Sequence, residues 1–479
     1  MKVLLINPPW HQEIYSNLVA SLAGFSQPLG LASIAAYLRV HGHEVRIIDA
    51  NTEQISLGRL AEYLPEGFRV IGTTSLTPSV DTSVKVMQLA KNKFPRVKTM
   101  MGGVHITAVG KEIMGKIPEI DFGVIGEGEE TVLELADSLE NNKSTDNIKG
   151  LIYRKGEEVI QNERRPPIAN LDKLPFFAYD LLPMDKYRLP AHHIGFNRKV
   201  PIGRFALVFT SRGCPARCGF CSSKLIWGRT VRFRSARYVV EEIEMLVGRF
   251  GVKVVEFADD VFTLDKRRLH DILDGIIAKR LNIHFNCLSR VDTIALEDLE
   301  KMKKAGCYLI RYGVESGSQK ILERMHKNIT AEQVIKTLGM TKKAKIASSV
   351  SFMIGYLGET EQTVKETIAL AKQIDADRTL FFIAVPFPGT EFFEIAKKEN
   401  LILEAVGGER WALLSRKGIL QTESLSREDL IRLRNKAYHE VGINPKHLWR
   451  YIRRIRTWAQ VKICIKGFIA MLTLTHTEK

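Results

Sequence analysis

The stretch RFALVFTSRGCPARCGFCSS, residues 204–223, joins a short apolar segment to three cysteines. RFALVFT predicts a buried β-strand. Cys214, Cys218 and Cys221 follow it in a C-x3-C-x2-C pattern on one loop. Because soft thiolates at this spacing can converge on one metal centre, the stretch predicts a strand that delivers three sulfur ligands to a single point.

Three thiolates are one fewer than most sulfur-bound metal centres use. A structural zinc ion takes four ligands, and the next cysteine, Cys287, lies in another predicted strand. Iron–sulfur clusters are also normally held by four thiolates, so three would leave one iron open to a substrate or cofactor. We favour this cluster over zinc and over a chance group of buried cysteines. Cys287, Cys307 and Cys464 are most simply small buried hydrophobic residues.

Strand and helix patterns alternate over residues 203–400, beginning with the strand that precedes the cysteine loop. Six predicted strands with intervening helices indicate an incomplete parallel (βα)6 barrel, whose active site is formed by loops at the carboxyl ends of the strands. A separate alternation fills residues 1–140. It predicts a Rossmann-like, doubly wound sheet of five parallel strands, which binds its ligand beyond their carboxyl ends.

The ligand-binding edge of the first sheet is rich in glycine and small polar residues, in the segments NPPW, TSLTPS, GGVHIT and GEGEE. Such residues let a large ligand lie against the backbone, although they would also close tight turns in any sheet of this type. No GxGxxG follows the first strand, which disfavours a dinucleotide.

The two halves together resemble the cobalamin-dependent radical S-adenosylmethionine enzymes. The cysteine motif after the first barrel strand, with GVESGS and MIGYLGET, resembles the radical S-adenosylmethionine core. The segments NPPW, QPLGLASIAAYLRVHGHEVRIIDA, MMGGVHIT and VIGEGEET resemble the cobalamin-binding domain. The resemblance implies a [4Fe-4S] cluster on the three cysteines, S-adenosylmethionine chelated by the open iron with its adenine beside Phe220, and cobalamin on the first domain.

The cobalamin site implied by this resemblance lies on the strand-end loops. Its predicted residues are Ser75, Thr77, Gly102, Gly103, His105, Gly126, Glu127 and Gly128. The Asp-x-His-x-x-Gly loop that supplies a lower axial histidine is absent after the first strand, which implies base-off cobalamin without that ligand. His105 is the substitute to consider, but a loop histidine more often serves as a hydrogen-bonding group.

Strand alternation predicts which barrel residues face inward. The apolar sets, with Phe257, Cys287, Tyr308 and Tyr312 among them, suit the helix-covered face. The opposite set is polar and consists of His284, Asn286 and the charged residues Glu256, Asp260, Arg290, Arg311 and Glu315. Buried charges need partners, and a zwitterionic sulfonium nucleotide would match them. An internal ion pair such as Arg311 with Glu315 is the alternative. Gly355, in MIGYLGET, joins the predicted nucleotide contacts through the family resemblance.

The predicted activity is reductive cleavage of S-adenosylmethionine to a 5'-deoxyadenosyl radical, followed by methyl transfer from cobalamin to an unactivated carbon. A radical cyclase or oxidative rearrangement is the alternative within the same family. A tRNA methylthiotransferase would carry a second cluster on N-terminal cysteines, and residues 1–213 contain none. A non-catalytic cobalamin sensor would leave the cysteine triad unexplained. The chemistry implies a low-potential electron donor of the flavodoxin or ferredoxin type.

The remaining segments connect and extend these domains. Residues 141–202 predict a linker with one hairpin near GLIYRKGEEVI, and residues 401–479 a helical region that ends in a basic amphipathic tail. Of the net charge of +16, residues 444–479 carry eight Lys and Arg against one Glu, so the basicity is local and a nucleic-acid partner is disfavoured. We expect a cytoplasmic chain. Its tail would dock either on the barrel or on an anionic membrane, and the second case favours a lipid or isoprenoid-like substrate.

Overall fold

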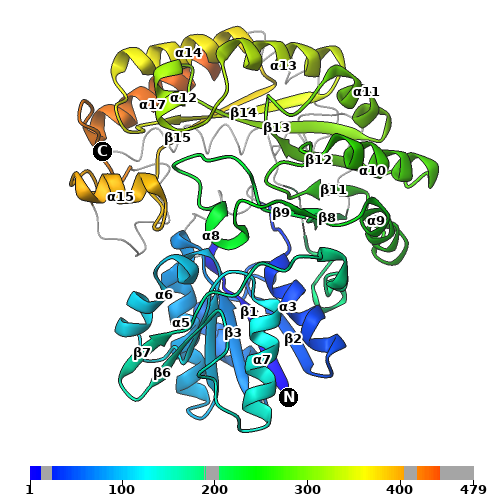
Figure 1. Cartoon of the computed structure of the whole chain (residues 1–479), viewed down its shortest axis with the longest axis vertical. Coiled ribbons are helices and arrows are strands. Elements are labelled where there is room, and N and C mark those ends of the chain that lie inside the picture. The colour runs from blue at the N-terminus through cyan, green and yellow to red at the C-terminus, as the bar shows by residue number, and fades with distance from the viewer. Residues whose placement is uncertain (12–23, 188, 190–203, 404–417, 443–479) are drawn as a thin grey trace.

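Two sheets organise the chain, as Figure 1 shows for a computed structural model that describes residues 1–11, 24–187, 189, 204–403 and 418–442. The first sheet has seven strands in the order β2-β1-β3-β4-β5-β6-β7, and the second has six in the order β15-β14-β13-β12-β11-β8. The two sheets lie in separate halves of the molecule, with α8 (Ser223–Trp227) between them in Figure 1.

The parallel part of the first sheet confirms the predicted doubly wound domain. Its strands are β1 (Lys2–Asn7), β2 (Glu44–Asp49), β3 (Val70–Thr74), β4 (Lys98–Gly102) and β5 (Phe122–Val124). In β1, Val3 and Leu5 belong to the core beneath α3 (Leu29–Val40) and α7 (Glu129–Glu140). Leu4 and Ile6 belong to the core on the other face. That face is covered by α4 (Leu57–Tyr63), α5 (Val80–Lys93) and α6 (Val104–Lys116). Apolar side chains on both faces explain why β1 reads as a continuous hydrophobic run.

The predicted hairpin is present, but it belongs to the first sheet. β6 (Leu151–Lys155) pairs antiparallel with β5, and β7 (Glu158–Gln161) pairs antiparallel with β6. The sheet therefore continues beyond residue 140 and is mixed instead of five-stranded and wholly parallel.

The second sheet confirms the predicted six-stranded partial barrel, because all its neighbouring strands are parallel. Its strands are β8 (Phe205–Val208), β11 (Val254–Phe257), β12 (His284–Ser289), β13 (Cys307–Glu315), β14 (Ala347–Ile354) and β15 (Arg378–Ile383). The connecting helices include α9 (Ala236–Phe250), α10 (Lys266–Ala278), α11 (Leu296–Lys304), α13 (Ala331–Lys343) and α14 (Glu361–Ile374), while α17 (Arg427–Gly442) packs against β15. Such helices bury the outward apolar residues of the strands and leave the inward face for polar groups.

The first domain covers the edge of the barrel at β8. The Gln27 side chain donates to the carbonyl oxygen of Phe205 at 2.8 Å and accepts from the Leu207 amide at 3.1 Å. One side-chain amide thus satisfies two backbone groups of an edge strand that would otherwise be open to pairing.

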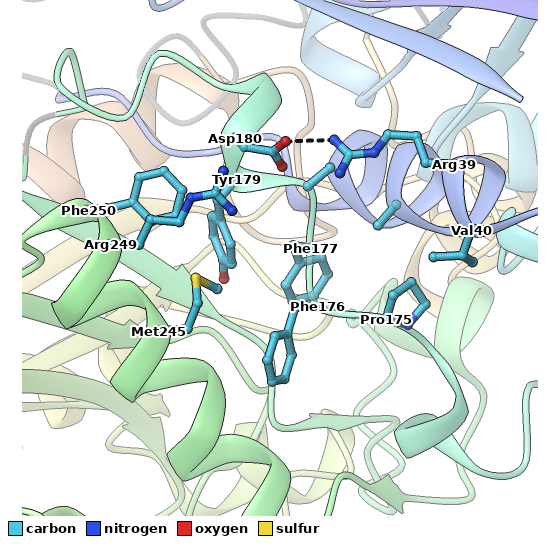
Figure 2. Close-up of a pocket in the computed structure, with 12 residues that line it drawn as sticks. Arg39, Val40, Pro175, Phe176, Phe177, Tyr179, Asp180, Met245, Arg249 and Phe250 are labelled. Atoms are coloured by element: carbon cyan, nitrogen blue, oxygen red, sulfur yellow. Dashed lines mark hydrogen bonds and ion pairs between the residues drawn. The ribbon is translucent and has the colours of Figure 1, made fainter. Parts of the chain in front are cut away.

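A strap of residues 171–187 holds the two domains together. Tyr187 donates its hydroxyl to Asp49 at 2.6 Å, and Tyr179 donates to the carbonyl oxygen of Leu207 at 2.8 Å. A cavity of about 240 Å³ lies where the strap meets α3 and α9. Figure 2 shows the residues that line it, among them Arg39 and Asp180, which form an ion pair of 2.8 Å. Residues 171–187 of the predicted linker are therefore packed structure.

The predicted basic tail and the last part of the predicted linker lie outside the described residues. The basic tail, residues 443–479, includes Cys464, and most of residues 188–203 likewise fall outside. In the part of the chain that is described, no helix combines the length and apolar character needed to span a membrane.

Candidate active site

The three cysteines lie on a loop at the carboxyl end of β8. β9 (Ser211–Arg212) precedes the loop, α8 follows it, and β10 (Arg232–Phe233) pairs antiparallel with β9. This is the barrel edge at which an active site was predicted.

Two adjacent aspartates after β11 anchor both ends of this loop. Asp259 is fully buried and accepts hydrogen bonds from the Thr210 amide and hydroxyl, each at 2.8 Å, and from the Ser211 hydroxyl at 2.7 Å. Asp260 accepts from the hydroxyl of Ser223, two residues after Cys221. Burial raises the pKa of both carboxyl groups. The cysteine loop is therefore held at its start and at its end by one neighbouring turn.

The three thiols of the loop do not all lie within 4.8 Å of one another. Sulfurs on one tetrahedral zinc lie about 3.8 Å apart, given a Zn–S bond of about 2.3 Å. In the described part of the chain, three possible ligand atoms lie within 4.8 Å of one another only in the group His43, Asp137 and Glu140, far from this loop. The thiols still affect one another, since the charges of Cys218 and Cys214 add to the burial that raises the pKa of Cys221 to about 11.

The inward face of the barrel carries a polar group with unused hydrogen-bonding atoms. Arg311 donates to Glu256 Oε1 at 2.5 Å, and Asn286 is the register partner of Glu256 on β12. Arg311 Nε and Asn286 Oδ1 are buried and have no hydrogen-bond partner. Because a buried unpaired polar atom is costly, these atoms fit a polar ligand in the barrel, as S-adenosylmethionine would be.

Other predicted nucleotide residues lie close to the cysteine loop. Glu315 accepts from Lys327 at 3.2 Å, and the Lys327 ammonium lies 5.8 Å from the centre of the Phe220 ring. Arg290 forms a two-pronged pair with Asp292 at 2.8 Å and donates to the carbonyl oxygen of Lys327 at 2.9 Å. The charges of Cys218 and Cys214 contribute to raising its pKa, after those of Asp292.

Two contacts differ from those that side-chain alternation along the strands predicted. Arg311 pairs with Glu256 across β12, and Glu315 pairs with Lys327, so the pair considered between Arg311 and Glu315 is not formed. Tyr308 was predicted on the outer face, but Asn286 Nδ2 donates to its hydroxyl at 3.2 Å. The pairing of β12 with β13 shifts by one residue at this point, and such a bulge reverses the side on which a residue lies.

Gly355 lies at the end of β14, with φ of 97°. Its amide donates to the buried carboxylate of Glu359, and a Cβ atom there would meet Leu430 of α17 at 3.0 Å. The position thus requires glycine for its backbone geometry and close packing.

A second cavity, of about 300 Å³, opens at the carboxyl ends of the first sheet. Of the predicted cobalamin contacts, Gly102, Gly103, Gly126, Glu127 and Gly128 line it. Its other walls include apolar residues of α3, Val132 of α7, and Phe209, Arg212, Ile226 and Trp227 from the cysteine-loop region. Small residues and an apolar wall fit a large cofactor that approaches the backbone.

Ser75, Thr77 and His105 do not line this cavity. Ser75 donates its hydroxyl to the carbonyl oxygen of Gly102 at 2.9 Å and so stabilises the end of β4. His105 is buried, its Nδ1 lies 3.1 Å from the Thr77 hydroxyl, and burial lowers its pKa to about 4. This environment matches the interpretation of His105 as a hydrogen-bonding group.

Sequence reasoning missed Arg212, Trp227, Asp259 and Lys327. Arg212 and Trp227 flank the cysteine motif, so proximity to it was the available signal. Asp259 neighbours the predicted Asp260 but was not selected, and nothing local marks Lys327, whose partner Glu315 lies in another element.

Comparisons with known proteins agree with this geometry. Residues 208–371 match the family model for the radical SAM superfamily, and residues 15–136 match that for the B12-binding domain. An uncharacterized methyltransferase of Pyrococcus horikoshii is 36% identical over 449 residues, which cover 94% of each chain. An anaerobic magnesium-protoporphyrin IX monomethyl ester cyclase of Rubrivivax gelatinosus is 29% identical, over 98% of this chain and 82% of the cyclase.

The fold also matches a solved structure. The radical S-adenosylmethionine methyltransferase TsrM of Kitasatospora setae, solved with cobalamin and a [4Fe-4S] cluster, aligns with a TM-score of 0.71 at 19% identity, over 94% of this chain and 90% of TsrM. Both family models match in the predicted order, and the 36% identical Pyrococcus horikoshii protein covers nearly the whole chain. The protein therefore belongs to the cobalamin-dependent radical S-adenosylmethionine enzymes.

Proposed function

We propose that this enzyme methylates an unactivated carbon of its substrate. One observation carries the proposal: residues that flank the three-cysteine loop, Arg212 and Trp227, also line the cavity of the first domain. Two cofactors bound at these places would act on one substrate between them. The relatives named as methyltransferases support the same activity.

When bound, the cluster and S-adenosylmethionine supply a 5'-deoxyadenosyl radical, and cobalamin supplies a methyl group. In the proposed site, Cys214, Cys218 and Cys221 hold the cluster and leave one iron open. Arg311 and Asn286 offer unpaired polar atoms to the nucleotide. The chain's own task is to orient these groups and to keep water out.

A radical cyclase is the second candidate, because cyclases are among the relatives that cover most of this chain. The two activities differ in what becomes of the methyl group. Anaerobic incubation with S-adenosylmethionine labelled in its methyl group and an extract of the host, followed by mass spectrometry, tests this. A labelled product supports methylation, and a product that loses hydrogen without gaining label contradicts it.

The assignment of the cluster ligands is tested by substitution. Changing Cys214, Cys218 or Cys221 to Ala should abolish the cluster absorption and all 5'-deoxyadenosine formation. Cys307→Ala is the matched control, since Cys307 is a buried barrel cysteine away from the loop, and it should keep iron and activity. Full iron content and cleavage in the triple variant would contradict the assignment.

The enzyme requires an external reductant, and we propose a flavodoxin or ferredoxin-type donor. We further propose that it works in the cytoplasm. The tail sequence favours docking on the barrel, and peripheral membrane contact with a lipid or isoprenoid-like substrate is the second proposal.

A further inference from the structure

Arg212 joins the cysteine loop to the wall of the cobalamin cavity. It lies two residues before Cys214 and is 6% exposed. Its Nη1 donates to Glu127 Oε2 at 3.0 Å, and its Nη2 donates to Glu129 Oε1 at 2.6 Å. Both carboxylates belong to the GEGEE segment, which lines the cavity and begins α7. One guanidinium group thus holds two carboxylates of the other domain, a geometry that favours arginine.

A second arginine completes a neutral, buried group. Arg232 pairs in register with Arg212 across β9 and β10, and its Nη2 lies 2.5 Å from Glu127 Oε1. Ser33 of α3 donates its hydroxyl to Glu129 Oε1 at 2.5 Å. The pKa of Glu129 is lowered, since the pull of Arg212 outweighs the effect of burial. Two positive and two negative charges are therefore matched inside the domain junction.

The other end of the cysteine loop reaches the same cavity. α8 begins two residues after Cys221, and its Ile226 and Trp227 line the cavity. The Arg212 guanidinium carbon lies 4.8 Å from the centre of the Trp227 ring, a cation–π contact. α8 also packs against α6 of the first domain. In Figure 1, α8 accordingly lies between the two halves of the molecule. Both ends of the loop are thus built into the cavity wall.

We propose that Arg212 is a positioning residue that couples the two cofactor sites: filling the cavity fixes the cysteine loop, and with it the affinity for S-adenosylmethionine. This inference rests on the proposed function, because it takes the loop as the cluster site and the cavity as the cobalamin site. Coupling between binding sites is reciprocal, so each ligand must change the affinity of the other by the same factor.

The experiment measures two dissociation constants on the full chain with its cluster reconstituted under anaerobic, non-reducing conditions. Labelled S-adenosylmethionine is measured by equilibrium dialysis with and without saturating hydroxocobalamin. Hydroxocobalamin is measured by quenching of tryptophan fluorescence with and without S-adenosylmethionine. In the wild type we expect the same factor in both directions, roughly fivefold or more.

The test variant is Arg212→Met with Glu129→Gln, which removes one positive and one negative charge together and leaves Glu127 with Arg232. The matched control is Arg237→Met with Glu241→Gln, the same change in an exposed pair on α9. We expect the factor to fall to about one in the test variant, with iron content and measurable binding of both ligands retained, and to stay at its wild-type value in the control. Because Arg212 and Glu129 line the cavity, the affinity for hydroxocobalamin itself will change, but the coupling factor is a ratio and is read independently of it.

Three results would overturn the proposal: no coupling in the wild type, unchanged coupling in the test variant, or loss of both cofactors from that variant, which would mean that the pair serves folding alone. Failure of the proposed function is seen separately, as absence of 5'-deoxyadenosine from the reduced wild-type enzyme.

Discussion

The carbonyl oxygen of Thr230 occupies the space that a Cβ atom on Gly213 would take. Gly213 is the residue immediately before the first cysteine, and its φ of 99° lies in the region that favours glycine. Thr230 belongs to the segment that leads into β10. The close approach of these two backbones fixes where the cysteine loop leaves β9.

Gly213→Ala should therefore impair cluster assembly. Gly228→Ala is the matched control, because Gly228 also has positive φ, of 73°, but nothing lies within 4 Å of its Cβ position. Backbone strain of this kind costs about 1–3 kcal/mol, and we expect Gly228→Ala to lose about that much stability and Gly213→Ala to lose more. Only Gly213→Ala should also lose iron, since its Cβ displaces a backbone. Iron analysis after reconstitution checks this, and equal iron contents in the two variants would contradict it.

Glu242 should make stability depend on pH. It is fully buried on α9, accepts from the Tyr179 hydroxyl of the strap at 3.4 Å, and has its pKa raised by burial from 4.5 to about 7. The contribution of Glu242 to stability is complete below the unfolded pKa near 4.5. Above that pH the unfolded chain ionises more readily than the folded chain, so the contribution is lost as the pH rises through the folded pKa of about 7. This loss amounts to about 3 kcal/mol.

Thermal unfolding between pH 5 and 8 measures this effect, with Glu242→Gln as the comparison. Glutamine keeps a carbonyl oxygen for Tyr179 but cannot ionise, so the variant should lose less stability across this range. Burial raises the pKa of Glu359 to about 8, so this residue also makes stability fall as the pH rises. Because Glu359 is present in both proteins, the difference between the two curves isolates Glu242. Parallel curves would show that Glu242 does not titrate in this range.

Cobalamin should bind without a histidine ligand. His105 is buried, turned toward Thr77, and does not line the cavity. The paramagnetic resonance spectrum of the cob(II) form should show no nitrogen superhyperfine splitting, and His105→Ala should leave it unchanged. Added imidazole provides the positive control. Splitting that is present in the wild type and absent in His105→Ala would reverse this conclusion.

If the tail does not dock on the barrel, it should bind anionic membranes. Its apolar residues recur at helical spacing, and basic residues lie between them: Leu448, Tyr451, Ile452, Ile455, Trp458 and Ala459 against Arg450, Arg453, Arg454 and Arg456. Each basic side chain near an anionic surface contributes about 1 kcal/mol. Co-sedimentation with anionic vesicles should weaken with salt and vanish on truncation after Ile443, with neutral vesicles as the control. Equal recovery in the supernatant with either vesicle type would remove both the membrane contact and the lipid substrate inferred from it.

Local patterns were enough to predict the elements and the loop that carries the three cysteines. The alternation of strands and helices depends on the hydrophobic period within each segment, and Cys214, Cys218 and Cys221 lie on one loop because the first and the last are only seven positions apart. Glu256 and Arg311 were predicted on one face because side chains alternate regularly along a strand. For the same reason, Tyr308 was misplaced where a bulge interrupts that alternation.

Only the tertiary structure decided the partners of the charged residues and the joint between the domains. Arg311 pairs with Glu256 instead of Glu315, and Arg212 pairs with Glu129, 83 residues away, because folding sets these distances and sequence separation does not. A buried charge requires a partner, but the sequence does not say which of many opposite charges folding will bring to it. The sequence by itself thus determined which chemistry the chain can hold, and the packing of two domains against one loop decided how its sites are connected.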